Sequence, residues 1–569
     1  MPNTASLGPG ERRAALQRLP DERFDIVVIG AGVTGAGCAL DAASRGLSVA
    51  LIEQRDIASG TSSRSSKLIH GGLRYLEHFD FQLVWEALHE RGLLLRKLAP
   101  HLVRPIRFVY PLRHRIWERA YVGSGIAIYD LMAATRRHPL PRHRHLSKQA
   151  LRDRIPSLAP AGFVGGIEYS DATTDDARFT LAVVRTAVRE GAVVASSVRA
   201  VGFTRSGRRI SGVEAEDVET GDRFTIAGRV IVNATGVWAD DIEQLAGDDL
   251  PNVTPSKGIH LVVPKDRIEA HAGVITRTDK SVLFIIPFGD KWVIGTTDTP
   301  WDLDLAHPAA SRSDIEYLLA QVNRLLREPL SRADVVGVFT GLRPLVRGDA
   351  SSTARLSREH VVLRPAPGLL TIVGGKYTTY RVMAEDTIDE SGDDFARRPP
   401  RSRTAALPLL GADGFAALWK RRATIARAHH IEVATVERLL TRYGDELPRL
   451  LARMKERPDL ILALPGSGGY LRAEIEFAVT DEAALHLDDV LTRRTRISIE
   501  VPDRGMMAAG EAASIMAEVL GWDETTTAAE INRYRNRVMA ELESQDQADD
   551  VFAAAARSTA ADSRLLGWR

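Results

Sequence analysis

The chain has 569 residues, of which 44% are apolar and 26% charged, and its 75 basic and 74 acidic residues leave a net charge of +1. This balance excludes the large basic excess of a nucleic-acid-binding protein, and the length predicts about two to four domains. The single cysteine, Cys38, excludes an intrachain disulfide and a cysteine-based metal cluster. We therefore predict no metal site and no nucleic-acid partner.

The N-terminal segment, residues 1–22, is polar and lacks the apolar core of a signal peptide. No run of about 18 uncharged apolar residues occurs along the chain, so no membrane-spanning helix is predicted. We expect a cytoplasmic protein that is soluble or attached to a membrane surface.

Residues 24–54 carry the strongest local signal. An apolar run predicts a strand that leads directly into Gly30-x-Gly32-x-x-Gly35, then a helix and a second strand that ends at Glu53. This order is typical of a dinucleotide site. Gly30 makes the tight turn, Gly32 lets the backbone approach a pyrophosphate, and Gly35 lets the helix lie close to the sheet. Glu53 is placed to bond ribose hydroxyls, although this motif alone does not separate NAD from FAD.

The next segments favour FAD. Residues 175–203 predict a helix followed by a strand, and residues 210–240 predict an antiparallel insert that ends in a buried strand. A parallel sheet with such an insert resembles the FAD-binding domain of glutathione-reductase-like and D-amino-acid-oxidase-like flavoproteins. In those families the turn after this strand contacts the cofactor, which here implies Ala234, Thr235 and Gly236.

Residues 61–77, "TSSRSSKLIHGGLRYLE", begin eight positions after Glu53. They should therefore start at the carboxyl edge of the sheet, where doubly wound folds bind ligands. Gly71 and Gly72 would let the main chain run close to a flat ring, so we expect this cluster beside the cofactor. The predicted cofactor contacts here are Thr61, Ser62, Ser63, Ser66, Lys67, Leu68, His70 and Gly71.

Six blocks together resemble the FAD-dependent, quinone-linked glycerol-3-phosphate dehydrogenases. They are "GTSSRSSKLIHGGLRYLE", "NATGVWAD", "GIHLVVP", "VIGTTDT", "TGLRPL" and "VGGKYTTYR". They occur in the family's order and cover about residues 25 to 390. The resemblance implies an α/β fold with a Rossmann-like FAD-binding domain, an antiparallel-sheet substrate domain and a helical C-terminal domain. It also implies that FAD is bound non-covalently.

The expected domain organisation follows from these blocks and from composition. After the polar segment 1–22 we expect one oxidoreductase unit, 23–395, a linker at 396–414, a helical domain at 415–545 and a tail at 546–569. Within the unit, the FAD-binding part is expected mainly at 23–110, 170–255 and 338–395, and the substrate side mainly at 111–169 and 256–337.

The family reaction oxidises sn-glycerol 3-phosphate to dihydroxyacetone phosphate, with a hydride passing to flavin N5. The phosphate needs cations, for which Arg74, Arg343 and Lys376 are the candidates, and Arg343 and Lys376 are also expected to act in catalysis. The hydroxyl needs a base, for which His70 is preferred. His260 is expected to bind substrate instead, and Tyr75 could add a hydroxyl to the phosphate.

A second set of cofactor contacts follows the later strands. Residues 374–379 form a strand-to-helix turn that the family places against the pyrimidine end of the flavin. Lys376 could there stabilise a reduced anion. The members of the set are Thr297, Asp298, Gly375, Lys376, Tyr377 and Thr378.

Residues 104–145 hold nine arginines and two acidic residues, a local net charge of +7, together with aromatic residues and an apolar stretch. This mixture suits a helix on an anionic membrane face, where the enzyme would deliver electrons to a membrane quinone. The C-terminal domain is expected to be a cap or a homodimer element. The alternatives are a glycerophosphate oxidase that uses oxygen, an amino-acid or amine oxidase of the same fold, and a nucleotide-binding module without catalysis.

Overall fold

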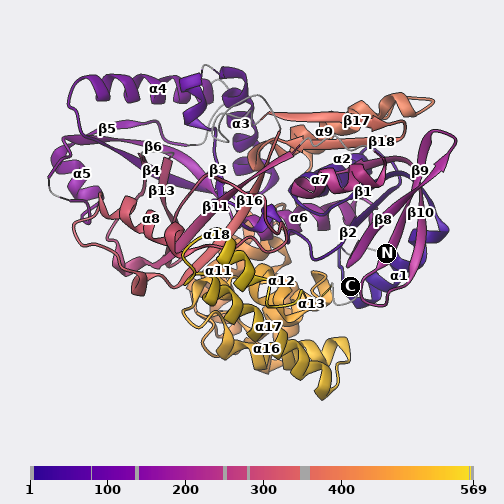
Figure 1. Cartoon of the computed structure of the whole chain (residues 1–569). Helices are drawn as coiled ribbons and strands as arrows, with labels where there is room; N and C mark the ends of the chain where they lie inside the picture. Colours follow the sequence, from indigo (N-terminus) through magenta and orange to yellow (C-terminus); the bar gives the residue numbers. More distant parts are fainter. Residues whose placement is uncertain are drawn as a thin grey trace.

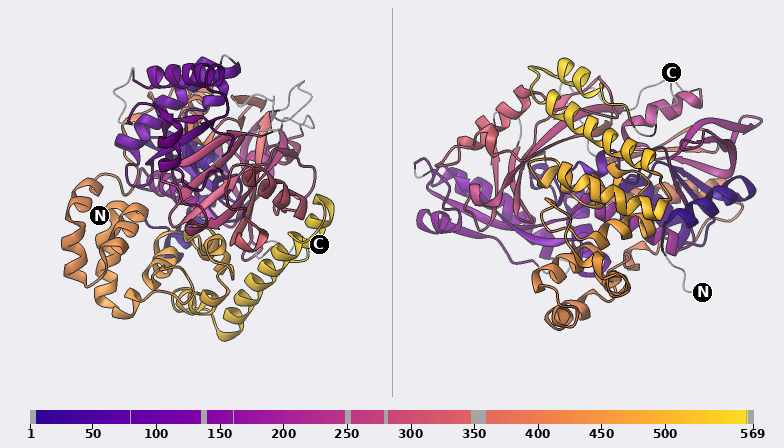
Figure 2. Two further views of the ribbon diagram at one scale, coloured as in Figure 1. Left: turned by 90° about the vertical axis from the view of Figure 1, so that its left-hand side faces the viewer. Right: turned by 90° about the horizontal axis from the view of Figure 1, so that it is seen from below.

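The computed structural model describes residues 5–78, 80–134, 140–159, 161–247, 253–278, 282–346, 359–562 and 564, and the side chains of residues 74, 77, 78 and 134 lie outside this description. Two sheets lie side by side, and a helical C-terminal domain packs below both of them (Figure 1). The left view of Figure 2 places helix α4, Trp117–Ala134, at the top of the molecule and the C-terminal helices at the bottom.

The first sheet has the expected parallel core with an antiparallel insert. β1 lies between β10 and β2, and both pairs are parallel, as are β10–β18 and β2–β7. The order is β17-β18-β10-β1-β2-β7, with β9 paired to β10 and β8 paired to β9. The strands are β1 (Arg23–Ile29), β2 (Val49–Glu53), β7 (Val193–Ser196), β8 (Val198–Ser206), β9 (Arg209–Asp217), β10 (Arg223–Asn233), β17 (His360–Ala366) and β18 (Leu369–Gly374).

Small residues let the helices of this domain pack closely on the sheet. A Cβ on Gly35 would lie 1.9 Å from the carbonyl oxygen of Gly30, and one on Gly37 would lie 3.0 Å from the ring of Tyr380. A side chain therefore cannot fit at Gly35, where helix α2 (Val33–Ser44) lies against the turn after β1, and one at Gly37 would be a tight fit against the neighbouring helix. The helices of this domain are α1 (Pro9–Asp21), α2 (Val33–Ser44), α6 (Asp176–Arg189), α7 (Ala239–Leu245) and α9 (Tyr380–Glu390).

The second sheet has ten strands and is mainly antiparallel. It contains the expected hairpin around Gly289, because β13 and β14 pair antiparallel on either side of it. Its strands are β3 (Leu68–Ile69), β4 (Arg104–Leu112), β5 (Arg144–Ser147), β6 (Gly165–Thr173), β11 (Val253–Pro264), β12 (Gly273–Arg277), β13 (Val282–Phe288), β14 (Lys291–Gly295), β15 (Thr299–Pro300) and β16 (Gly337–Val346). The flanking helices are α3 (Phe81–Leu93), α4, α5 (Lys148–Arg154) and α8 (Arg312–Asn323).

The two parts of the oxidoreductase unit share the chain differently from the expected ranges. β3, β4 and β16 were expected in the FAD-binding part, yet all three belong to the second sheet. β16 pairs with β11 over ten residue pairs, from Val253↔Val346 to Val262↔Gly337, and this long pairing assigns it to the substrate side.

The C-terminal domain is helical, as expected, but its flanking segments are built into the fold. The predicted linker 396–414 packs on the FAD-binding domain, where Leu409 is buried and donates its N–H to the carbonyl of Leu98 at 2.8 Å. The predicted tail contains a helix, α18, whose Asp550 binds the buried Lys257 of β11. The helices are α10 (Phe415–His429), α11 (Val433–Tyr443), α12 (Leu447–Glu456), α13 (Arg472–Asp481), α14 (Leu487–Asp489), α15 (Ile497–Glu500), α16 (Met506–Leu520), α17 (Glu524–Ser544) and α18 (Asp550–Arg557).

No helix among the described residues is both long and apolar enough to cross a lipid bilayer.

Candidate functional site

A cavity of about 510 Å³ opens at the carboxyl ends of β1, β2, β10 and β18 and continues toward the second sheet. This is the edge at which doubly wound folds bind nucleotides. Most of the predicted site residues line it: Gly30, Gly32, Glu53, Thr61, Ser62, Ser66, Leu68, His70, Tyr75, Ala234, Thr235, Gly236, His260, Arg343, Gly375, Lys376 and Tyr377.

The other predicted residues lie around this lining. Arg74 belongs to the 3-10 helix Leu73–His78, but its side chain is outside the described part of the structure. Seven residues contact lining residues or their supports without facing the cavity themselves: Gly35, Ser63, Lys67, Gly71, Thr297, Asp298 and Thr378.

The glycine motif forms a cradle at the start of α2. Gly30 has φ +101°, and a Cβ there would lie 2.9 Å from the carbonyl oxygen of Ala234. A Cβ on Gly32 would lie 3.2 Å from Oγ of Ser62, which accepts the N–H of Val33 at 2.9 Å. A side chain at either glycine would fill the space beside the helix N-terminus, where backbone N–H groups attract a pyrophosphate.

Glu53 closes the opposite side of this cradle. Its carboxylate accepts the N–H of Ala31 at 2.8 Å and that of Arg55 at 2.9 Å. Burial raises its pKa, while these two hydrogen bonds oppose that rise. The carboxylate is therefore held rigidly at the edge of the cavity, which suits recognition of ribose hydroxyls.

The cavity has an apolar end that sequence reasoning missed. Residues 198–201 of β8 and the ring of Trp238 line it, and the guanidinium of Arg55 lies 5.6 Å from the centroid of that ring. Apolar walls, a glycine cradle and a polar far end match the adenine, pyrophosphate and flavin parts of FAD in turn. Trp238 lies inside the motif "NATGVWAD", which is the signal that could have revealed it.

The loop that carries His70 is anchored by a buried ion pair. Nζ of Lys67 lies 2.8 Å from Asp176, and both side chains are fully buried. Burial lowers the pKa of Lys67, the charge of Arg496 lowers it further, and Asp176 raises it. Lys67, predicted as a cofactor contact, thus directs its ammonium group away from the cavity, and its side chain positions the loop.

Tyrosine side chains occupy the space that a side chain would need at the two glycines after His70. The N–H of Gly71 donates to the hydroxyl oxygen of Tyr129 at 2.8 Å, and a Cβ on Gly71 would lie 2.6 Å from that oxygen. A Cβ on Gly72 would lie 2.3 Å from the ring of Tyr75. We expected these glycines to let the backbone run close to a flat cofactor ring. At both Cβ positions, the nearby groups are instead side chains of the protein itself.

His70 itself is held at both its backbone and its ring. Its backbone N–H donates to Oγ1 of Thr378 at 3.1 Å, and its Nδ1 accepts the N–H of Gly72 at 3.1 Å. In the neutral ring the proton then lies on Nε2, because Nδ1 acts as the acceptor. The Nδ1 lone pair of His70 is thus already engaged within its own loop.

His260 is buried and neutral. Its Nε2 lies 2.8 Å from Oγ of Ser66, and its ring stacks on Phe339 with centroids 4.7 Å apart. Burial lowers its pKa well below the usual value, and the charges of Arg343 and Lys67 lower it further. Its Nδ1 is buried and forms no hydrogen bond with any described residue. An imidazole with one engaged and one unengaged nitrogen is suited to hold or accept a proton.

Arg343 extends from β16 into the same part of the cavity. Its Nη2 donates to Oγ1 of Thr296 at 3.0 Å and to the carbonyl of Thr297 at 3.1 Å, and its Nη1 lies 3.6 Å from Asp298. Thr297 in turn accepts the N–H of Ile259. Thr297 and Asp298, predicted as cofactor or substrate contacts, therefore orient the guanidinium.

Lys376 completes the polar end. Its Nζ lies 3.8 Å from the centroid of the Tyr75 ring, a cation–π contact between the turn after β18 and the loop that carries His70. Two cations, Arg343 and Lys376, and two imidazoles, His70 and His260, thus line one cavity together with the glycine cradle.

Comparison with known proteins identifies the class of protein to which this fold and site belong. The family model for FAD dependent oxidoreductases matches residues 25–381, and the model for the C-terminal domain of alpha-glycerophosphate oxidase matches residues 402–527. The chain is 50% identical to a glycerol-3-phosphate dehydrogenase of Mycobacterium leprae over 98% of this chain and 96% of the relative. It is 36% identical to the mitochondrial glycerol-3-phosphate dehydrogenase of Rattus norvegicus over 91% of this chain and 73% of the relative. The protein is an FAD-dependent oxidoreductase and belongs, within that class, to the glycerol-3-phosphate dehydrogenase family.

Solved structures agree with this assignment. The crystal structure of a glycerol-3-phosphate dehydrogenase from Bacillus halodurans complexed with FAD matches with a TM-score of 0.76 at 28% identity, covering 94% of this chain and 98% of that chain. An L-alpha-glycerophosphate oxidase from Mycoplasma pneumoniae with FAD bound matches with a TM-score of 0.53 at 18% identity, covering 68% and 99% of the two chains, and shows the shared fold alone. The predicted fold class and the FAD cofactor are confirmed.

Proposed function

We propose that this protein oxidises sn-glycerol 3-phosphate to dihydroxyacetone phosphate and that its electrons pass to a membrane quinone. One observation carries the substrate assignment. Arg343, Lys376 and the neutral His260 line the same cavity as the FAD cradle. A dianionic phosphoester needs such paired cations, whereas an amino acid offers a single carboxylate and an amine that a second cation would repel.

Each residue has a separate task in this reaction. When bound, FAD supplies the electron acceptor for the hydride on C2 of the substrate. Arg343 and Lys376 bind the phosphate and hold the carbinol in a fixed orientation, since Arg343 is itself fixed by Thr296 and Thr297. Arg74 joins this set as a further predicted phosphate ligand.

We assign the base to His260 rather than to His70. Nδ1 of His70 is already occupied by the N–H of Gly72, so the neutral ring has no free lone pair there. In His260, an Nε2–H that donates to Ser66 leaves the lone pair of Nδ1 to accept the proton of the substrate hydroxyl. His70 then acts mainly to position its loop and to contact the cofactor.

Quinone is favoured over oxygen as the electron acceptor by an exposed apolar surface. Ile116, Trp117 and Leu131, at and within α4, are 82%, 62% and 69% exposed, and Phe81 and Trp85 of α3 are 44% and 40% exposed. Large apolar side chains in a segment rich in arginine favour a helix pair that lies in the membrane interface. We propose that this surface attaches the enzyme to the inner face of the cytoplasmic membrane.

A homodimer is proposed through the opposite end of the molecule. Met539 and Leu542 of α17 and Val551 and Phe552 of α18 are exposed on two adjacent helices. Light scattering of the purified protein tests this proposal. A concentration-independent monomer mass would overturn it.

The activity is tested by anaerobic titration of the yellow holoenzyme. Glycerol 3-phosphate should bleach the flavin absorbance, whereas glycerol and amino acids should not. The bleached protein should then recover its colour faster with a soluble quinone analogue than with air. Bleaching by an amino acid would overturn the substrate assignment, and faster recovery in air would favour the oxidase alternative.

A further inference from the structure

A second cavity, of about 70 Å³, lies where residues 55–64 meet the C-terminal domain. Seven arginines and three acidic residues, Asp488, Glu530 and Asp562, line its walls, so basic residues outnumber acidic ones. We call it the arginine cavity, and it is defined by Arg55, Arg64, Arg493, Arg533, Arg537, Arg557 and Arg564.

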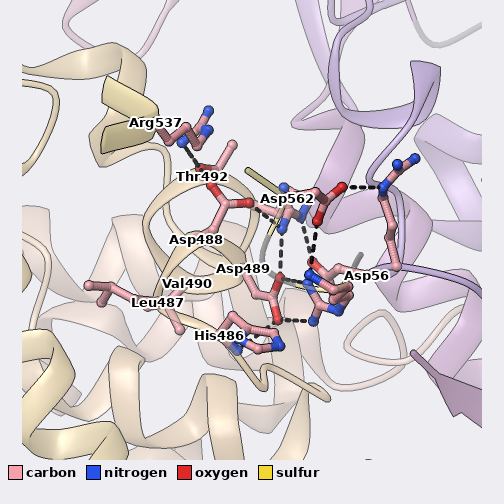
Figure 3. A network of polar contacts seen from close by, with 12 residues as sticks. Asp56, His486, Leu487, Asp488, Asp489, Val490, Thr492, Arg537 and Asp562 are labelled. Atoms are coloured by element: carbon pink, nitrogen blue, oxygen red, sulfur yellow. Dashed lines mark hydrogen bonds and ion pairs between the residues drawn. The ribbon is translucent and has the colours of Figure 1, made fainter. Parts of the chain in front are cut away.

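Several of these arginines bind carboxylates and form close ion pairs. Arg564 lies 2.6 Å from Asp489, Arg55 lies 2.7 Å from Asp562, and Arg493 contacts Asp56. Figure 3 shows Asp56, Asp488, Asp489 and Asp562 meeting in this network. These arginines have their charge balanced. The pairs of Arg55 and Arg493 join residues 55 and 56 to the C-terminal part of the chain, and the pair of Arg564 lies within that part.

The positive charges of Arg64 and Arg557 are not balanced by a close carboxylate in this way. The guanidinium of Arg64 donates to the carbonyl of Ala306 at 3.5 Å and forms no ion pair with any residue in the described ranges. The carboxylate nearest to Arg557 is Glu541, at 3.7 Å, and Glu541 already binds Arg537 at 2.7 Å. The cavity therefore has at least one guanidinium charge without a countercharge.

The surroundings of Arg64 make that charge costly. Burial, together with the neighbouring charges of Arg537, Arg493 and Arg557, lowers its pKa to about 10. Arg64 is partly buried, and a charge removed from water without a partner destabilises the folded state, so an anion bound beside it would reduce the penalty. Guanidinium groups that converge from several directions match the oxygens of a tetrahedral oxyanion.

We propose that the arginine cavity binds a phosphate group, either inorganic phosphate or the head of a phosphomonoester. The site is separate from the substrate contacts assigned to Arg343 and Lys376, because neither of those residues lines it. Arg64 lines both cavities, and it lies two residues before Ser66, the partner of His260. Anion binding would therefore be sensed at the catalytic cavity, and the site has the placement of a regulatory one.

A rival explanation is that bound FAD supplies the missing countercharge. Arg64 also lines the FAD cavity, so the pyrophosphate of the cofactor is a candidate partner. The experiment is therefore made on protein saturated with FAD. If the cofactor neutralises Arg64, no phosphate will bind in the arginine cavity of that protein.

The test is equilibrium dialysis of radiolabelled inorganic phosphate against the FAD-saturated Arg343→Ala protein, whose substrate phosphate site is weakened. We expect saturable binding of one phosphate per chain. Arg64→Ala, added to this background, should weaken binding about tenfold or more, since it removes a charge-assisted contact. Arg535→Ala is the matched control, because Arg535 is on α17 but faces solvent, and it should leave the affinity unchanged.

A second variant tests the proposal independently in case Arg64→Ala fails to fold. Arg557→Gln removes a charge from another wall and should also weaken phosphate binding. Competition experiments then identify the kind of phosphate ligand. Displacement of the labelled phosphate by phenyl phosphate shows that the site accepts a monoester. Displacement by sulfate but not by phenyl phosphate restricts the site to the free anion. Unchanged affinity in both Arg64→Ala and Arg557→Gln, or the absence of saturable binding, would overturn the proposal.

Discussion

Nε2 of His260 lies 2.8 Å from Oγ of Ser66, a residue of the loop that also carries His70. This contact engages one nitrogen of a buried, neutral imidazole and leaves the other for the substrate. His260→Asn should therefore slow flavin reduction by about 100-fold or more, the usual range for loss of a general base. Anaerobic stopped-flow absorbance measures this rate.

The pH profile separates His260 from His70. Because the folded-state pKa of His260 is lowered, its neutral form persists below pH 6.5, so the acid limb of kcat/KM in the wild type should lie below that value. His70→Asn should reduce activity less and keep this limb. An acid limb that disappears in His70→Asn but persists in His260→Asn would reverse the assignment.

Arg343→Ala should remove one charge-assisted phosphate contact. The expected loss in kcat/KM for glycerol 3-phosphate corresponds to about 1.5–3 kcal/mol, or about 10–150-fold. Steady-state kinetics with a quinone analogue measures it. Arg208→Ala is the control, because Arg208 is exposed on the β8–β9 hairpin. Equal kinetics in both variants would place Arg343 outside the substrate site.

Gly32→Ala should weaken FAD binding with little effect on folding. The new Cβ would lie 3.2 Å from Oγ of Ser62, inside the cradle where the pyrophosphate must approach. We expect about tenfold or greater loss in FAD affinity, since a cofactor phosphate cannot approach the backbone as closely. Reconstitution of the apoprotein, followed by flavin fluorescence, gives the affinity. Gly510→Ala, at an open position on α16, should bind FAD normally.

His486 should make stability depend on pH above neutrality. It lies 3.1 Å from Glu219 and 3.0 Å from Glu530; burial alone would lower its pKa, yet the two carboxylates raise it to about 9. A raised folded-state pKa stabilises the protein fully below pH 6.5, and this contribution is lost as the pH rises through 9. The free energy of unfolding of the wild type relative to His486→Gln should fall by about 3 kcal/mol between pH 6 and 9.5. His114→Gln, at an exposed site, should show no such trend.

Replacing apolar side chains of α4 should weaken membrane attachment. Trp117→Ser together with Leu131→Ser should lower partition to anionic vesicles about tenfold or more, given about 1.5–3 kcal/mol per buried side chain. Vesicle sedimentation measures this. Leu462→Ser, exposed in the C-terminal domain, is the control. Arg136 and Arg137, expected to add electrostatic attraction, lie outside the described residues. Equal sedimentation of all variants would remove the support for this surface.

The local part of the fold was predictable from sequence. The order of strand, glycines, helix and strand at residues 24–54 depends on contacts between near neighbours in the chain, and β1, α2 and β2 follow it closely. The hairpin at Gly289 was predictable for the same reason. Most predicted site residues meet in one cavity because they sit at the ends of such strands.

Other features depend on partners far away in the sequence. β16 belongs to the second sheet because it pairs with β11, about eighty residues earlier, and no local pattern shows this. Tyr129 supports Gly71 from α4, and the walls of the arginine cavity come from five separated stretches of chain. The predicted tail is instead a structural element because Asp550 neutralises the buried Lys257. Periodicity cannot reveal such pairings.

Arg496 of the C-terminal domain lies 2.7 Å from Asp175 and also binds Asp176, the partner of Lys67. Lys67 of the oxidoreductase unit and Arg496 of the C-terminal domain thus bind the same carboxylate, that of Asp176, beneath the loop that carries His70. A chimera that joined this oxidoreductase unit to the C-terminal domain of a relative without the matching arginine would leave that carboxylate short of one cation. Evolutionary exchange of the two modules is therefore constrained, and they are expected to change together.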